Sequence, residues 1–403
     1  MLNILALIQI SFGLIGVSPF LFYWIKMKNL SKQPMKIPPE PEIWPSLTIV
    51  LPVRNEEIVL KKKLQNLEYQ EYPIDKIELI VIDSNSSDST LEILDQWNSS
   101  RKSKFTLSTI IMDEHLGKSA AINRILEENF ESDAMVITDA DALLAPNSLK
   151  RIGRWLSEEK IGAVCGSQQI IETESTEHFL NEKSYRSFYH DLRIGESSQS
   201  STPIFEGSLA AYRNCLIEGK QIDSTYNADD SQLAILIHRE GGRSIMDQEL
   251  QFFESLPSSR QSAKSRRIRR ASGLVHLFTR NSAKEFDSNF STIFRNEAWA
   301  HLFMPFFVFF SVVSMLCHII YSTYLLIFEI NFDIYHIFLL LIDSLFFLCL
   351  LFGNQIQLGR ILRSFLIAQY TLLLANTQMY LGKDYRYWNQ DIESRISIIQ
   401  DLE

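Results

Sequence analysis

Residues 134–141 read Ala-Met-Val-Ile-Thr-Asp-Ala-Asp, and the interpretation of the whole chain starts from this stretch. The apolar, β-branched run Ala134–Thr138 is typical of a buried strand, and Asp139 and Asp141 follow it directly. Alternate side chains of an extended backbone point the same way, so both carboxylates can face one divalent cation. A cation held there can neutralise a bound diphosphate. For the pair taken alone, a solvated turn after a strand is the alternative.

Strands and helices alternate on both sides of this stretch. We expect strands at 46–53, 77–82, 105–112 and 134–138, and helices at 57–69, 89–97, 118–128 and after Pro146. Segments of these lengths in alternation predict an α/β fold with a doubly wound, mostly parallel sheet. The second half is less regular, with helices expected near 175–192 and 229–240 and a strand near 204–211.

Polar residues follow three of the expected strands. Glu56 comes shortly after the first, Asp83 ends the second, and Asp139 and Asp141 end the fourth. Ligands of parallel α/β sheets bind outside the carboxyl ends of the strands. The sequence therefore predicts that these residues converge on one edge of the sheet.

Four apolar segments, 3–25, 302–328, 332–353 and 361–381, are each long enough to cross a membrane as a helix. The third contains Asp343, which we expect to face a partner or a cavity. Four lysines between residues 26 and 36 follow the first segment, and by the positive-inside rule they keep that end in the cytoplasm. We therefore expect a multi-pass protein, integral to the plasma membrane, with a cytoplasmic globular domain.

The expected organisation has six parts. They are a membrane anchor (1–28), a proline-rich linker (29–45), the globular domain (46–260), interfacial amphipathic helices (261–300), about three membrane helices (301–382) and a C-terminal tail (383–403). Three C-terminal crossings would leave the tail outside, whereas residues 383–388 are similar to cytoplasmic tails. A segment such as 361–381 that is interfacial or re-entrant would resolve this conflict.

Composition excludes two classes of protein. The net charge of −9 argues against a general nucleic-acid binder. The four cysteines are far apart, so they indicate neither a metal cluster nor a disulfide framework.

Six motifs occur in a fixed order along the chain. They lie at 46–57, at 81–90, at 117–123 (Gly-Lys-x-x-Ala-x-Asn), at 139–141, at 205–213 and at 228–230. Together they resemble the motifs of membrane-integrated family 2 glycosyltransferases with the GT-A fold, which include dolichyl-phosphate sugar transferases and polysaccharide synthases. The resemblance covers about residues 46–275.

This resemblance implies an inverting glycosyltransferase at the cytoplasmic face of the membrane. The sugar would pass from a nucleotide-sugar donor to a lipid-linked or other membrane-associated acceptor, with membrane lipids as further partners and no nucleic acid. Asp139 and Asp141 would hold Mg²⁺ or Mn²⁺, and Asp83 would bind the base or ribose. Lys118, which opens a helix, would face the diphosphate. Asp230 is the expected general base for the acceptor hydroxyl.

Two further residues are assigned less directly. Glu56 either assists donor binding or caps a helix. Processive relatives have a Gln-x-x-Arg-Trp signature near residues 264–273; here Arg269 keeps the arginine and Arg270 replaces the tryptophan. Arg269 would clamp the diphosphate, or this basic helix would face anionic lipid headgroups. The missing tryptophan disfavours the alternative function, a processive polysaccharide synthase that extrudes its product.

Overall fold

The computed structural model describes residues 2–102, 105–128, 131–170, 177–257, 259–328, 334–352, 357–382 and 391–400. Within them, eight strands form one mixed sheet in the order β3-β2-β1-β4-β7-β6-β8-β5. The strands are β1 Leu47–Val53, β2 Ile77–Asp83, β3 Thr106–Ile111, β4 Ala134–Thr138, β5 Leu143–Leu144, β6 Ile161–Ile170, β7 Leu209–Arg213 and β8 Arg243–Glu254.

The first four strands in sheet order, β3, β2, β1 and β4, are parallel, as the sequence predicts. Helices cover both faces of this half. On one face lie α2 (Leu60–Glu68), α3 (Thr90–Ser100) and α5 (Ser148–Leu156), and on the other lie α4 (Lys118–Leu126) and α8 (Asp229–Arg239). Burial on both faces explains why β1, β2 and β4 are continuous apolar runs. The predicted doubly wound α/β architecture is thus confirmed.

The other half of the sheet departs from the parallel pattern. β7 runs antiparallel to both β4 and β6, and β5 runs antiparallel to β8. The strand expected at 204–211 begins only at Leu209, and the sequence patterns do not predict β5, β6 or β8. Because β7 is reversed, the loop that precedes it lies at the same edge as the loop that follows β4. Residues that precede β7 thereby lie beside residues that follow β4.

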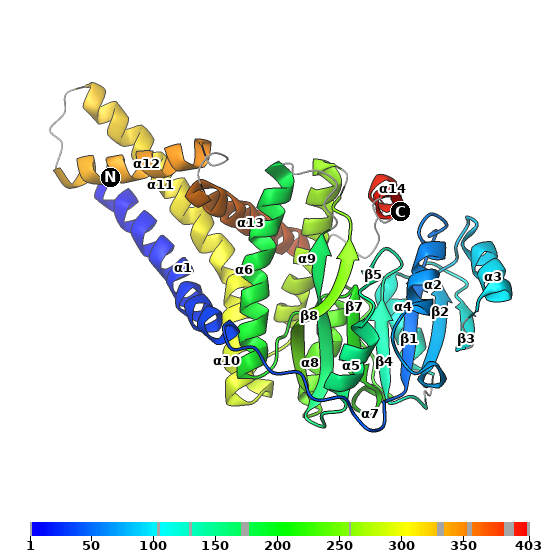
Figure 1. Ribbon diagram of the computed structural model, residues 1–403. Helices are drawn as coiled ribbons and strands as arrows, with labels where there is room; N and C mark the ends of the chain where they lie inside the picture. Colours follow the sequence, from blue (N-terminus) through cyan, green and yellow to red (C-terminus); the bar gives the residue numbers. More distant parts are fainter. Residues whose placement is uncertain are drawn as a thin grey trace.

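Four helices in the described part of the chain are long and apolar enough to cross a membrane. They are α1 (Leu2–Ser31), a continuous helix over Ser288–Ile327, α12 (Ile334–Leu351) and α13 (Gln357–Tyr380). The second consists of α10 (Ser288–Ala298), a π-helical turn at Trp299–Phe303 and α11 (Met304–Ile327). α1 and α11 run side by side away from the sheet (Figure 1).

Asp343 of α12 has partners on two other helices. His318 of α11 lies 2.9 Å from one of its carboxylate oxygens, and Gln9 of α1 donates to the other at 2.5 Å. The expectation that this buried acid faces a partner is confirmed. The polar contacts join α1, α11 and α12 at a single point.

The C-terminal part of α1 packs against a helix of the globular domain, α6 (Glu177–Gln199). Phe20, Tyr23 and Met27 are buried there. At the crossing, a Cβ atom on Gly195 would lie 2.1 Å from the carbonyl oxygen of Met27. The two backbones are therefore in direct contact, which only glycine permits.

The remaining elements are the helices α13 and α14 and three short helical segments. α13 packs on α9 (Arg260–Arg280) through Leu372 and Ala375, which contact Ala271 and Val275. α14 (Ile392–Gln400) lies on the globular domain beside the sheet edge near α2 (Figure 1). Most of the residues predicted as a tail precede or follow α14 and lie outside the described residues. The short elements are η1 Ile74–Lys76, α7 Asn214–Ile217 and η2 Ala283–Glu285.

A buried lysine supports the loop after β4. Lys63 occupies the apolar face of α2 with Leu60, Leu64 and Leu67, and it is 0% exposed. Its Nζ donates to Thr138 Oγ1 at 2.7 Å and to the carbonyl of Ala142 at 2.5 Å. Lys63 thus holds the residues on both sides of Asp139-Ala140-Asp141. Burial lowers the pKa of Lys63 to about 7, although Asp139, Asp141 and Glu254 oppose this shift.

We predict that Lys63 makes stability depend on pH. Its folded pKa is about 7 and its ordinary value is 10.5, so between these values the unfolded chain binds more protons than the folded one. Stability therefore rises with pH there, by up to about 1.4 kcal/mol per pH unit from this group. Lys63→Met should flatten the rise of melting temperature between pH 7 and 9, in detergent with EDTA, whereas the exposed Lys61→Met should not. An unchanged slope in Lys63→Met would contradict the assignment.

The α1–α6 crossing gives a second prediction. Gly195→Ala places a methyl group 2.1 Å from the Met27 carbonyl oxygen, so the two helices must separate at a cost of about 1–3 kcal/mol. We expect a lower melting temperature for Gly195→Ala and none of this loss for Ser198→Ala on the same helix. Equal melting temperatures would show that the crossing is not in tight contact.

Candidate active site

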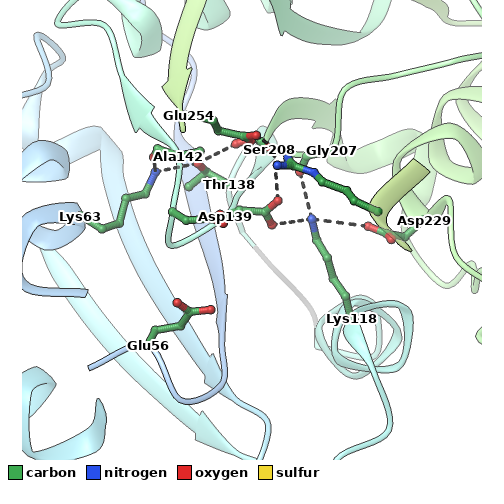
Figure 2. Close-up of polar contacts among 12 residues, drawn as sticks. Glu56, Lys63, Lys118, Thr138, Asp139, Ala142, Gly207, Ser208, Asp229 and Glu254 are labelled. Carbon is green, nitrogen blue, oxygen red and sulfur yellow. Dashed lines mark hydrogen bonds and ion pairs between the residues drawn. The ribbon is translucent and has the colours of Figure 1, made fainter. Parts of the chain in front are cut away.

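The predicted polar residues gather at the edge where β1, β2 and β4 end. The reversed strand β7 brings the loop Phe205–Ser208 to the same place, and α8 begins beside it. Figure 2 shows Lys118 of α4 pointing toward Asp139 and Asp229. The convergence predicted from the sequence is therefore present.

Lys118, the first residue of α4, lies at the centre of the site. Its Nζ is 2.6 Å from Asp139 Oδ1, donates to the carbonyl of Gly207 at 3.0 Å and lies 3.9 Å from Asp229 Oδ2 (Figure 2). Gly117 precedes it with a φ of +89°, in the region that favours glycine. One ammonium group thus connects the loop after β4, the loop before β7 and the start of α8.

These contacts set the charge of Lys118 and Asp139. Burial lowers the pKa of Lys118, but Asp139 and Asp229 more than compensate and hold it above its ordinary value. Burial likewise raises the pKa of Asp139, yet Lys118 and a hydrogen bond from Ser208 Oγ at 3.1 Å keep it below its ordinary value. Asp139 is therefore a carboxylate and Lys118 an ammonium at neutral pH.

Asp141 and Glu56 share a cation that the sequence interpretation missed. Arg395 of α14 donates from Nε and one terminal nitrogen to the two carboxylate oxygens of Glu56, both at 2.8 Å, and lies 3.7 Å from Asp141 Oδ2. Burial raises the pKa of Glu56 to about 7, against the effect of Arg395. Burial, Glu254 and Asp139 raise the pKa of Asp141, and Arg395 again opposes them.

Asp230 lies in the first turn of α8, two residues after Ala228, which has a strained backbone conformation. Ala228 has a φ of +82°, a left-handed conformation that costs a residue with a side chain about 1–2 kcal/mol. The turn places Asp230 Oδ2 where a Cβ on Gly207 would lie 3.0 Å away. Gly207 thus makes room for this carboxylate. Burial and the neighbouring Asp229 raise the pKa of Asp230 to about 7, against Lys118.

Asp83 and Arg269 take positions around this centre. Asp83 is fully buried at the end of β2, and its two oxygens accept hydrogen bonds from the amide and hydroxyl of Ser86 at 2.9 and 2.5 Å. Arg269 lies on α9, where burial, Arg270 and Arg266 lower its pKa to about 10, while Asp139 and Asp229 raise it. Its charge therefore acts on the same carboxylates as Lys118.

The carboxylates of Asp139 and Asp141 fit a hard divalent cation. Among the described residues, no group of three His, Cys, Asp or Glu side chains forms a metal site. Two carboxylates therefore have to be complemented by other oxygen ligands, as when Mg²⁺ is bound through protein carboxylates and substrate phosphates. The donor set is all oxygen, which suits Mg²⁺ or Mn²⁺ and disfavours softer metals.

Three residues that the sequence interpretation missed lie in local sequence contexts that could have pointed to them. Lys63 stands at a position where the helical periodicity of α2 demands an apolar residue. Arg395 lies in a short segment rich in isoleucine, Ile392–Gln400, in which Arg395 and Ile398, three residues apart, are buried. Ser208 follows Gly207 within a quoted motif and contacts Asp139.

Comparisons with known proteins agree with this site. Residues 48–218 match the model of glycosyl transferase family 2, and residues 134–353, more than half of the chain, match that of glycosyl transferase family group 2. The solved structure of the mannosyltransferase PcManGT from Pyrobaculum calidifontis in complex with GDP-Man and Mn²⁺ is similar over 94% of this chain and 100% of that one, with a TM-score of 0.76 and 28% identity.

Curated relatives match over part of the chain. A probable glycosyltransferase of Bacillus subtilis, YdaM, is 28% identical over 209 residues, which are 49% of this chain and 47% of that protein. A beta-monoglucosyldiacylglycerol synthase of Trichormus variabilis is 33% identical over 120 residues, 30% of this chain and 25% of the synthase. The matches thus span half or less of the length of these relatives. With its six motifs on a GT-A-like sheet beside apolar helices, the chain belongs to glycosyl transferase family group 2.

Proposed function

We propose that this protein transfers a sugar, with inversion, from a nucleotide-sugar donor to a lipid-linked acceptor at the membrane surface. The observation that carries the proposal is the contact of Lys118 with Asp139, Gly207 and Asp229. It joins the proposed donor side of the site to the helix that bears the proposed base. The family membership supports the same reaction class.

In this mechanism each residue has one task. Asp230 accepts the proton of the acceptor hydroxyl as that oxygen attacks the anomeric carbon, and no covalent intermediate forms. Lys118 and Arg269 stabilise the negative charge of the leaving diphosphate. Asp83 binds the nucleoside. Asp139 and Asp141 would hold Mg²⁺ or Mn²⁺, which when bound would further neutralise the diphosphate.

The donor to test first is GDP-mannose. The structure of the mannosyltransferase that covers almost the whole chain contains GDP-Man and Mn²⁺. A lipid acceptor is supported by the apolar helices that flank the globular domain and by the diacylglycerol-linked name of one relative.

We propose that the membrane is crossed by α1, α11 and α12, with α13 at the interface. α14 contacts the globular domain, so the chain has returned to the domain's side after α13. An even number of the helices α11, α12 and α13 can then cross. α13 is the one that packs along α9 of the domain. This arrangement keeps the domain in the cytoplasm, on the side of the lysines in and after the last turns of α1.

The assay for the proposed reaction uses detergent-solubilised protein with a panel of nucleotide sugars and a polyprenyl phosphate or diacylglycerol acceptor. We expect release of a nucleoside diphosphate and a product one sugar longer. A ladder of longer products would instead identify a processive synthase. No turnover with any donor in the presence of Mn²⁺ or Mg²⁺ would overturn the proposal.

Asp230→Asn should lower kcat by about 10²–10⁴-fold, as expected for loss of a general base. In the unsubstituted protein, kcat/KM should rise with pH and level off above about 7, because Asp230 accepts a proton only when ionised and its pKa is raised to about 7. Initial rates between pH 5 and 9 test both statements, with the exposed Asp95→Asn as a control. Full activity of Asp230→Asn would make another group the base.

Asp141→Asn should lower the affinity for the metal ion more than it lowers the stability of the fold. Replacing one of two carboxylate ligands should raise the half-saturating Mn²⁺ concentration by about tenfold or more, with little change in melting temperature. Titration of Mn²⁺ into EDTA-treated protein measures the effect. An unchanged half-saturating concentration would remove Asp141 from the metal site.

A further inference from the structure

The contacts of α14 place a C-terminal helix on the proposed donor site. Arg395 is 2% exposed, bonds both oxygens of Glu56 and lies 3.7 Å from Asp141. The two carboxylates belong to loops that follow β1 and β4, some 250 residues and more before Arg395 in the sequence. The helix therefore adds a buried positive charge beside one of the proposed metal ligands.

A second set of contacts holds α14 independently of Arg395. Lys62 of α2 donates to the carbonyls of Ile398 and Ile399 at 3.0 and 2.8 Å. These carbonyls lie in the last turn of α14, where a cation is favoured by the helix dipole. Ser397 donates to Ser255 at 2.7 Å, and Ile398 is 2% exposed. The docked position is thus specified by packing and by polar contacts at the helix end.

The position of Arg395 conflicts with a cation on Asp141. Mg²⁺ binds a carboxylate oxygen at about 2.0–2.1 Å, and a nitrogen of Arg395 lies 3.7 Å from one oxygen of Asp141. The two positive charges would therefore stand within a few ångströms of each other in a largely buried site, where repulsion is weakly screened. Both oxygens of Glu56 are engaged by Arg395, so a donor that uses Glu56 must compete with this pair.

We propose that α14 is a latch on the donor site: its docked position and the metal-bound donor exclude each other at Glu56 and Asp141. Binding of metal and donor releases Arg395 from Asp141 and detaches the helix, and departure of the products lets it return. The proposal rests on the proposed function, because it assumes that Asp141 holds the metal. It predicts negative coupling between α14 docking and metal binding.

Three consecutive lysines provide a charge-matched test. Lys61 is exposed, Lys62 bonds the end of α14 and Lys63 is buried below the loop after β4. Lys61→Met and Lys62→Met remove the same charge one residue apart, but only the second removes a contact of α14. Neither residue belongs to the proposed catalytic groups.

Binding of Mn²⁺ alone, measured from the loss of the free-ion electron paramagnetic resonance signal, is the first readout. We expect Lys62→Met to bind Mn²⁺ at least about threefold more tightly than Lys61→Met, which should match the unsubstituted protein. Equal or weaker binding by Lys62→Met overturns the latch. If Mn²⁺ binds none of the three proteins, the proposed metal site itself fails, and the latch falls with it.

Amide hydrogen exchange of residues 391–400 is the second readout and does not depend on turnover. Saturating Mn²⁺ should accelerate exchange in α14 of the unsubstituted protein, and Lys62→Met should show accelerated exchange without metal. Increased protection of α14 on addition of Mn²⁺ would mean that Arg395 closes over the bound ion as a partner of the donor, and the latch would be wrong.

Discussion

The ion pair between Lys118 and Asp139 organises the candidate site. It joins the start of α4 to the end of β4 at 2.6 Å, and the same ammonium group reaches the Gly207 carbonyl and Asp229. Without this cation, Asp139, Asp229 and Asp230 would lose the ammonium group that contacts Asp139 and Asp229 directly, and leaving buried carboxylates without such a partner is strongly unfavourable. The contact thus permits a group of carboxylates to coexist where a metal and a diphosphate are proposed to bind.

The carboxylates of the site differ in how strongly burial and the neighbouring cations act on them, and this difference separates the roles of Asp139 and Asp230. Asp139 is held ionised by Lys118, whereas burial raises the pKa of Asp230 to about 7. A ligand for a cation needs a permanent negative charge, and a general base works best when its pKa is near the working pH. The environments of Asp139 and Asp230 therefore support the tasks proposed for these two residues.

Local sequence predicted the first half of the sheet and the identity of the polar cluster, because strand and helix patterns and short motifs are local. It did not predict that β7 is antiparallel, since strand direction depends on pairing with β4 and β6, which are distant in sequence. It also did not distinguish three consecutive lysines. Lys61 is exposed to solvent, Lys62 contacts the C-terminal end of α14, and Lys63 is buried in the core. Arg395 was missed because its partner Glu56 is 339 residues away.

The backbone contact between Gly195 and Met27 has a geometric consequence for the reaction. A helix that is long and apolar enough to cross a membrane is in direct backbone contact with a helix of the globular domain, so the domain cannot tilt freely on α1. In the proposed membrane arrangement, Asp230 would then stand at a fixed height above the lipid surface. An acceptor would be selected by how far its reactive hydroxyl projects from the membrane, in addition to its chemical identity.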